Sequence, residues 1–184
     1  YATSKDGIYW EKPTLDVVRG TNIVLDVGRD STVVWLDLLE KNPKKKYKMM
    51  VVVQCRDGRN GVIMTLHNSA DGIHWTQVPG GQFVAGDRCS IFYNPFRNKW
   101  VYSIRDDAQT VGRARAYAEC TDLEAGFSQL NKIRTPWTCA DKLDPRNPNP
   151  KLSNIYPELY NLDGVAYESL MLGLFSIWEG DPSK

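Results

Sequence analysis

A turn that occurs twice constrains this chain of 184 residues more than any other feature. Residues 4–10 read Ser-Lys-Asp-Gly-Ile-Tyr-Trp, and residues 69–75 read Ser-Ala-Asp-Gly-Ile-His-Trp. Asp-Gly between runs that alternate apolar and polar residues indicates a β-hairpin, because a type I′ turn needs positive φ at both central residues. A degenerate third copy is expected at Thr121-Asp122, with Phe127 in the place of Trp. Both Asp-Gly turns are interpreted as scaffold.

The segments between the turns predict short antiparallel strands in units of four. The expected strands are 32–37, 47–54, 61–69 and 73–78 in one unit, and 89–94, 99–105, 112–120 and 126–130 in the next. A connector rich in Pro and Asn follows, and a third unit begins with 163–169 and 170–178. The last run could also be a buried helix, but its place after a strand and turn favours a strand.

Repeated four-stranded antiparallel units are typical of a β-propeller, and turn copies about 50–65 residues apart are compatible with its blades. The sequence therefore predicts an all-β fold with one propeller domain over residues 1–184. Its blade units are expected at 1–13 (the end of a blade), 30–79, 87–130 and 163–184 (the start of a blade).

Composition excludes several classes of function. The formal net charge is +1, and the lysine-rich loop 41–48 has no interleaved aromatic residues, so neither a nucleic-acid nor a membrane-surface partner is expected. No apolar run approaches the roughly 20 residues of a membrane span. The four cysteines lack a C-x-x-C pair, which argues against a zinc site, and we expect no metal and no cofactor. They are Cys55, Cys89, Cys120 and Cys139, interpreted as mainly reduced core residues.

A carboxylate recurs at the start of each expected inner strand. Asp30, Asp87 and Asp163 occupy this place, and Glu168 follows Asp163 in the third unit. Inner strands of a propeller converge on its centre, so these acids are the catalytic candidates. Glycoside hydrolysis needs such a set: one acid protonates the leaving oxygen, and a second carboxylate acts as nucleophile or activates water. The alternative is that each aspartate caps a turn.

Arginines and aromatic residues near these acids are candidates for substrate binding. The forked guanidinium suits sugar hydroxyls or a carboxylated sugar. An aromatic ring on an inner strand can stack on a sugar or simply fill the wedge between blades. The candidates are Arg88, Arg105, Arg113, Trp35 and Tyr167, and the arginines could instead pair with acids between blades.

Two stretches carry a resemblance to a known group of enzymes. The Ser-x-Asp-Gly-Ile-x-Trp turns and "DRCSIFYNPFRNKWVYSIR" (87–105) resemble the five-bladed propeller glycoside hydrolases of families 32, 43 and 68, which include invertases, levansucrases and arabinanases. "YNLDGVAYESLMLGLFSIW" (160–178) is similar to bacterial proteins described as family 32-like. The resemblance implies a five-bladed ring, of which this chain covers about half, and a periplasmic or secreted location.

The catalytic motifs of those families match only in part. Asp87 lies where their Arg-Asp-Pro motif would place its aspartate, but the local order is Asp-Arg, and Arg29-Asp30-Ser31 also lacks the proline. Pro157-Glu158 matches the Pro-Asp of their Glu-Cys-Pro-Asp motif, whereas Ile155 takes the place of the acid. The general acid would then be Glu168, with Glu158 as the alternative. The Asn-Asp-Pro-Asn nucleophile motif is absent from the sequence.

Three functions follow from this sequence. The first is a hydrolase that cleaves a glycosidic bond of a carbohydrate substrate in a central pocket. The second is a propeller that binds sugars without cleaving them, and the third is a propeller scaffold for protein interactions. In every case an open half-ring would expose strand edges, so we expect either self-association or a missing remainder of the propeller.

Overall fold

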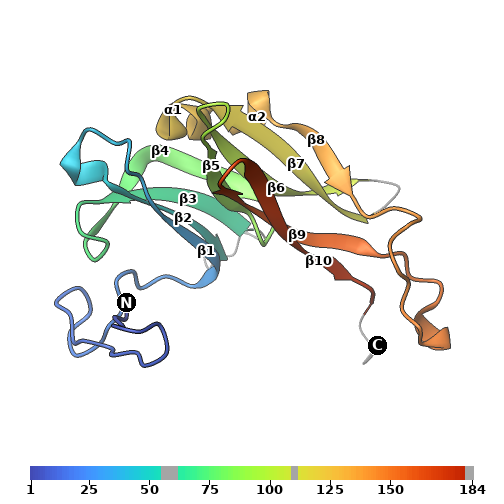
Figure 1. Cartoon of the computed structure of the whole chain (residues 1–184), viewed down its shortest axis with the longest axis horizontal. Coiled ribbons are helices and arrows are strands. Elements are labelled where there is room, and N and C mark those ends of the chain that lie inside the picture. The colour runs from blue at the N-terminus through green and yellow to red at the C-terminus, as the bar shows by residue number, and fades with distance from the viewer. Residues whose placement is uncertain (55–61, 109–111, 181–184) are drawn as a thin grey trace.

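The computed structural model describes residues 1–54, 62–108 and 112–180, and it confirms an all-β protein built from antiparallel sheets (Figure 1). Cys55 and the last four residues of the expected unit 163–184 lie outside the described residues. The segment before Arg29 holds no regular strand, only an isolated bridge between Thr3 and Glu11.

The first sheet has four strands that pair in chain order, β1-β2-β3-β4. Its strands are β1 (Arg29–Leu36), β2 (Tyr47–Gln54), β3 (Val62–Ser69) and β4 (Trp75–Ala85), with a 3-10 turn η1 at Pro43–Lys45. Runs such as Met-Met-Val-Val-Val in β2 form strands because branched and long apolar side chains pack well on a pleated, buried surface. The sheet extends beyond the expected end at residue 79.

The second sheet repeats this order as β5-β6-β7-β8. Its elements are β5 (Ser90–Asn94), β6 (Lys99–Ala108), β7 (Gly112–Cys120), helices α1 (Leu123–Ser128) and α2 (Leu130–Ile133), and β8 (Thr135–Cys139). The strand predicted at 126–130 is therefore wrong, as is the third Asp-Gly-like turn. The Asp122 side chain instead accepts a hydrogen bond from the Ala125 N–H and caps α1, and Phe127 is buried.

A two-stranded hairpin completes the structure. It consists of β9 (Glu158–Tyr167) and β10 (Leu170–Trp178), preceded by a 3-10 turn η2 at Pro150–Leu152. The strand interpretation of 170–178 is thus confirmed. β9 begins earlier than residue 163, so Asp163 lies within a strand rather than ahead of one.

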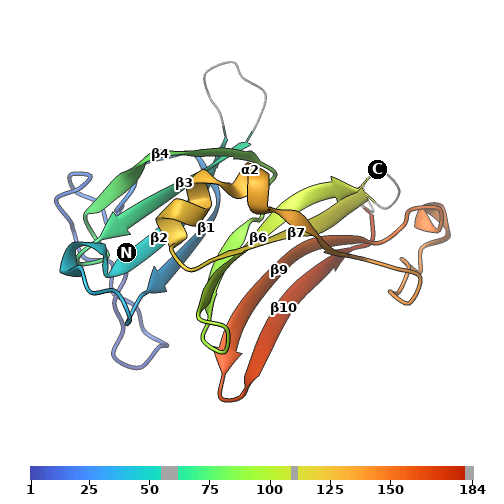
Figure 2. The same ribbon diagram turned by 90° about the horizontal axis from the view of Figure 1, so that it is seen from above.

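The layers pack face to face. β9 lies against β5, β6 and β7, and the two four-stranded sheets enclose the main core with α1 against β4 and β7 (Figure 2). The Gly164 backbone is close to the Phe92 ring, where an added Cβ would lie 2.8 Å from the ring. The core lies between the sheets and contains, among others, Met50, Leu66, Ile91, Tyr102 and Leu130.

The two Asp-Gly turns have the same geometry. In the second copy the Ser69 hydroxyl accepts from the Gly72 N–H (2.9 Å), and the Trp75 indole donates to the Gly72 carbonyl (3.1 Å). In the first copy the corresponding distances, made by Ser4, Gly7 and Trp10, are 2.8 and 3.1 Å. A type I′ turn is not formed, because among the described residues only the glycine of each pair has positive φ.

Candidate functional site

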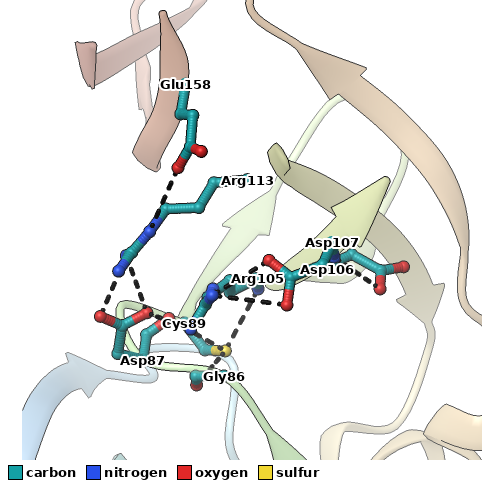
Figure 3. A network of polar contacts seen from close by, with 8 residues as sticks. All are labelled: Gly86, Asp87, Cys89, Arg105, Asp106, Asp107, Arg113 and Glu158. Carbon is teal, nitrogen blue, oxygen red and sulfur yellow. Dashed lines mark hydrogen bonds and ion pairs between the residues drawn. The ribbon is translucent and has the colours of Figure 1, made fainter. Parts of the chain in front are cut away.

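Most of the residues predicted from the sequence meet at one end of the sheets, although they come from four strands and the loop before β5. Figure 3 shows the ion pairs among Asp87, Arg105, Arg113 and Glu158. The neighbouring loop and strand starts converge because β9 crosses the face of the second sheet beside β5 and β7. The residues brought together are Asp30, Asp87, Arg88, Arg105, Arg113, Glu158 and Asp163.

Asp87 is clamped by two arginines. Its Oδ1 accepts from Arg105 Nη1 at 3.1 Å, and its Oδ2 accepts from Arg113 Nη1 at 3.0 Å. Arg105 also donates to Asp107 Oδ1 at 3.0 Å. Burial acts to lower the pKa of Arg105, but the carboxylates of Asp107 and Asp87 outweigh it and raise that pKa. The ion pairs fix the loop before β5 onto β6 and β7.

Arg113 links this clamp to the third unit. Its Nε lies 3.5 Å from Glu158 Oε2, so one guanidinium separates two carboxylates that come from different sheets. The Tyr160 ring lies beneath the same guanidinium, with 4.5 Å between Arg113 Cζ and the ring centroid. All three charged side chains are about one-fifth exposed, within reach of a ligand.

Glycines make room for these side chains. Gly112 has a φ of +70°, and a Cβ there would overlap the Glu158 carboxylate. A Cβ on Gly86 would overlap the Arg105 side chain in the same way. Contact with the site therefore requires both glycines, and at Gly112 the positive φ favours glycine as well.

A polar cavity of about 280 Å³ adjoins the ion pairs. Asp30, Arg88 and Asp163 line it, together with Asn161, whose amide donates to Asp163 Oδ2 at 2.8 Å. The β1 register shifts between Arg29 and Ser31, which leaves Asp30 at an irregularity of the strand. Within the described part of the chain, Asp30 Oδ1, Ser31 Oγ and Thr32 Oγ1 are buried without a hydrogen-bond partner.

A fully buried arginine lies in the second sheet beside these groups. Arg115 is 1% exposed and donates to Ser103, with 2.6 Å from Nη2 to the carbonyl oxygen. Burial lowers the pKa of Arg115. Burial likewise raises the pKa of the Cys89 thiol, which lines the cavity and accepts from the Arg105 N–H.

Three of the predicted residues lie elsewhere. Glu168 lies in the β9–β10 turn with a φ of +50°, about 16 Å along the strand from Asp163. Tyr167 is beside it and 60% exposed, outside the cavity. Trp35 packs edge-on against Trp100 in the core, with 5.8 Å between ring centroids, which agrees with the wedge-filling alternative. Glu168 lies apart from the other acids because five residues of extended strand separate it from Asp163.

Several residues of the site were not predicted. Tyr160 lies between Glu158 and Asp163 in sequence, and its spacing of two from Glu158 puts both on one face of β9. Arg115 follows Arg113 by the same spacing, so alternation along β7 could have indicated it. The glycines at positions 86 and 112 carry no local signal of the side chains that pass over them.

Across residues 1–54, 62–108 and 112–180, no group of three or more His, Cys, Asp or Glu side chains could hold a metal ion. In the same part of the chain, every helix is too short or too polar to cross a membrane. Comparison of the chain with protein-family models, curated proteins and solved structures finds no match.

Proposed function

We propose that this chain is a carbohydrate-active protein of the β-propeller type that cleaves a glycosidic bond at the inner ends of its sheets. The observation that supports this most is the placement of Asp87 and Glu158 on two sides of Arg113, beside a cavity lined by Asp30 and Asp163. Glycoside hydrolysis requires at least two carboxyl groups around one site, and this cavity is next to several.

The propeller is part of the proposal. Two four-stranded sheets in chain order and a following hairpin correspond to two blades and the first half of a third, near 29–85, 90–139 and 158–178. The N-terminal copy of the turn corresponds to the outer half of a preceding blade, because its Thr3–Glu11 bridge repeats the Asn68–Thr76 pairing of β3 and β4. The number of blades follows only from the family resemblance.

The proposed roles are as follows. Glu158, the alternative acid of the sequence prediction, takes up a proton as substrate displaces its contact with Arg113, and donates this proton to the glycosidic oxygen as that bond breaks. Asp87 stabilises the charge that develops on the sugar or takes the proton of the attacking water. Asp30 or Asp163 contacts sugar hydroxyls or attacks the anomeric carbon. Glu168 has no part in this scheme, since it lies at the far end of β9.

The proposal is tested with Asp87→Asn and Glu158→Gln on sucrose, levan, arabinan and a panel of nitrophenyl glycosides. Release of reducing sugar or nitrophenol is the readout. We expect each variant to lose roughly 100-fold or more in rate, since acid–base groups contribute about that much. Asp141→Asn, an exposed aspartate outside the site, is the matched control and keeps the activity. Unchanged rates in both site variants would refute the scheme.

Sugar binding without cleavage is the second candidate, and one observation favours it. Both carboxylate oxygens of Asp87 are held by guanidiniums, as expected of a structural ion pair. A glycan array that shows binding, together with no release of reducing sugar from the bound glycan, would select this candidate.

A further inference from the structure

We propose that the cavity selects a sugar that carries a carboxylate, a uronic acid or its glycoside, and that Arg88 binds this carboxylate. The inference rests on the proposed function and names the substrate class of the same site.

The backbone at Arg88 is constrained in an unusual way. Its φ of +56° makes it one of three non-glycine residues with positive φ in the described part of the chain. A left-handed conformation is unfavourable for such a residue, so the surroundings must hold it. The conformation places Arg88 at the cavity wall, with its Cζ 5.6 Å from the centroid of the Tyr160 ring.

Among the three arginines beside the acids, Arg88 is the one without an ion-pair partner in the described part of the chain, although its guanidinium lies against Tyr160. Arg105 is paired with Asp87 and Asp107, and Arg113 with Asp87 and Glu158. Among the described residues, no carboxylate oxygen lies within 4.0 Å of Arg88. A planar guanidinium without a carboxylate partner can bind a ligand carboxylate in a two-point contact.

The β1 wall of the same cavity calls for hydroxyl donors. Asp30 Oδ1 is buried without a partner in the described part of the chain, and the Ser31 and Thr32 hydroxyls also lack partners. Leaving a buried polar group unpaired is unfavourable. Sugar hydroxyls can donate to the Asp30 carboxylate and exchange hydrogen bonds with the two side-chain hydroxyls.

The two walls together define the ligand. A neutral sugar satisfies the Asp30 wall but gives Arg88 no anion. A compact dianion such as phosphate meets the negative charges of Asp30 and Asp163 across a cavity of about 280 Å³. A uronic acid has hydroxyls and one carboxylate on a rigid ring, so it can meet both walls at once.

The test uses matched pairs of probes: methyl glucuronide with methyl glucoside, and methyl galacturonide with methyl galactoside. Titration calorimetry on the whole chain measures Kd at low and high salt. We expect at least one uronide to bind roughly 10- to 100-fold more tightly than its neutral partner, the range of a charge-assisted hydrogen-bond pair. Added salt reduces this preference.

Variants assign the preference to Arg88. Arg88→Gln is expected to remove the preference for the uronide while leaving the neutral sugar bound as before. Arg88→Lys keeps the charge without the fork and retains part of the preference. Arg97→Gln, which removes an exposed arginine paired with Glu119 far from the cavity, is the matched control. Circular dichroism of each variant shows that it is folded.

Each outcome has a distinct meaning. Neutral sugars that bind as tightly as the uronides overturn the inference and leave the proposed function standing. A uronide preference that survives in both Arg88 variants overturns the role of Arg88. If no sugar of either kind binds or is cleaved, the proposed function fails and the inference fails with it.

Discussion

The position of the Glu158 carboxylate depends on a residue that has no side chain. Gly112 begins β7 with a φ of +70°, and any Cβ at this place would overlap Glu158. Gly20 has a similar φ of +78°, but nothing lies within 4 Å of the place where its Cβ would be. Substitutions at the two glycines therefore share the effect of backbone strain, whereas only the substitution at Gly112 adds a clash with the Glu158 side chain.

We predict that Gly112→Ala lowers glycosidase activity at least 10-fold, because the carboxylate must move away from Arg113. Gly20→Ala is expected to keep the activity. Both variants lose roughly 1 kcal/mol of unfolding free energy from left-handed strain at a non-glycine residue. Urea unfolding and the reducing-sugar assay measure the two effects. Equal activity in the two variants would show that Glu158 is not held by this contact.

At the scale of elements, the Asp-Gly turn occurs in two settings. Asp71 Oδ1 accepts from the N–H groups of Ile73 and His74, at 2.8 and 2.9 Å. Asp6 makes the same two bonds with Ile8 and Tyr9, at the same distances. Asp71 also contacts the His74 ring through its Oδ2 at 2.7 Å, where the other copy has Tyr9. The turn at Asp71 joins β3 to β4 of a complete sheet, whereas the turn at Asp6 is followed by one isolated bridge.

Asp71→Ala is expected to lower the free energy of unfolding by about 1–2 kcal/mol, since it removes the acceptor of two turn N–H groups on which a sheet depends. Asp6→Ala removes the same bonds from an exposed segment, and we expect a much smaller loss of unfolding free energy. Chemical denaturation followed by tryptophan fluorescence gives both values. A comparable loss in the two variants would mean that the N-terminal hairpin is integral to the folding unit.

The elements also show why sequence reasoning succeeds in some places and not in others. Strands with strong alternation or long apolar runs, such as β2 and β7, were predicted within their observed bounds. β8 was interpreted as connector because Pro136 interrupts a run of only five residues, while pairing with β7 makes it a strand. The segment 126–130 became helical because the Asp122 cap and burial of Phe127 and Leu130 outweigh local strand character.

In the candidate site, too, sequence reasoning places some residues correctly and others not. The sequence placed Asp30 and Asp87 near the starts of the first strand of each sheet, and the structure brings Asp30 and Arg88, the neighbour of Asp87, to one cavity. Glu168 and Tyr167 follow Asp163 by five and four residues along an extended strand, which carries them away from the other acids. The pairing of Asp87 with both arginines depends on contacts between distant segments, which spacing along the chain does not encode.

At the scale of the whole molecule, the β9–β10 hairpin presents an apolar face. Val165, Leu172 and Leu174 share this face through cross-strand pairing, with Asp163 of the site opposite Leu174, and Leu174 is 76% exposed. β10 pairs only with β9 in the described structure, so one edge of the hairpin is open. Open apolar edges promote pairing with other strands.

We therefore predict that the chain self-associates, with a sedimentation coefficient that rises with concentration. Leu174→Lys places a charge on the hairpin face and is expected to shift the equilibrium toward monomer. Val84→Lys is the matched control, because Val84 is also 76% exposed but belongs to β4 of the first sheet. A wild-type chain that sediments as a stable monomer at all concentrations would contradict this prediction.

Comparison of the two turn copies indicates how much of the turn conformation is determined by local sequence. The N-terminal copy adopts the same hydrogen bonds as the copy in the sheet, although no four-stranded sheet surrounds it. Its conformation is thus specified by about seven neighbouring residues and not by its tertiary context. Such a segment is expected to form the same chain-reversing turn when it is duplicated or grafted between two unrelated strands. A peptide of residues 1–13 would be the smallest specimen in which to observe this by NMR.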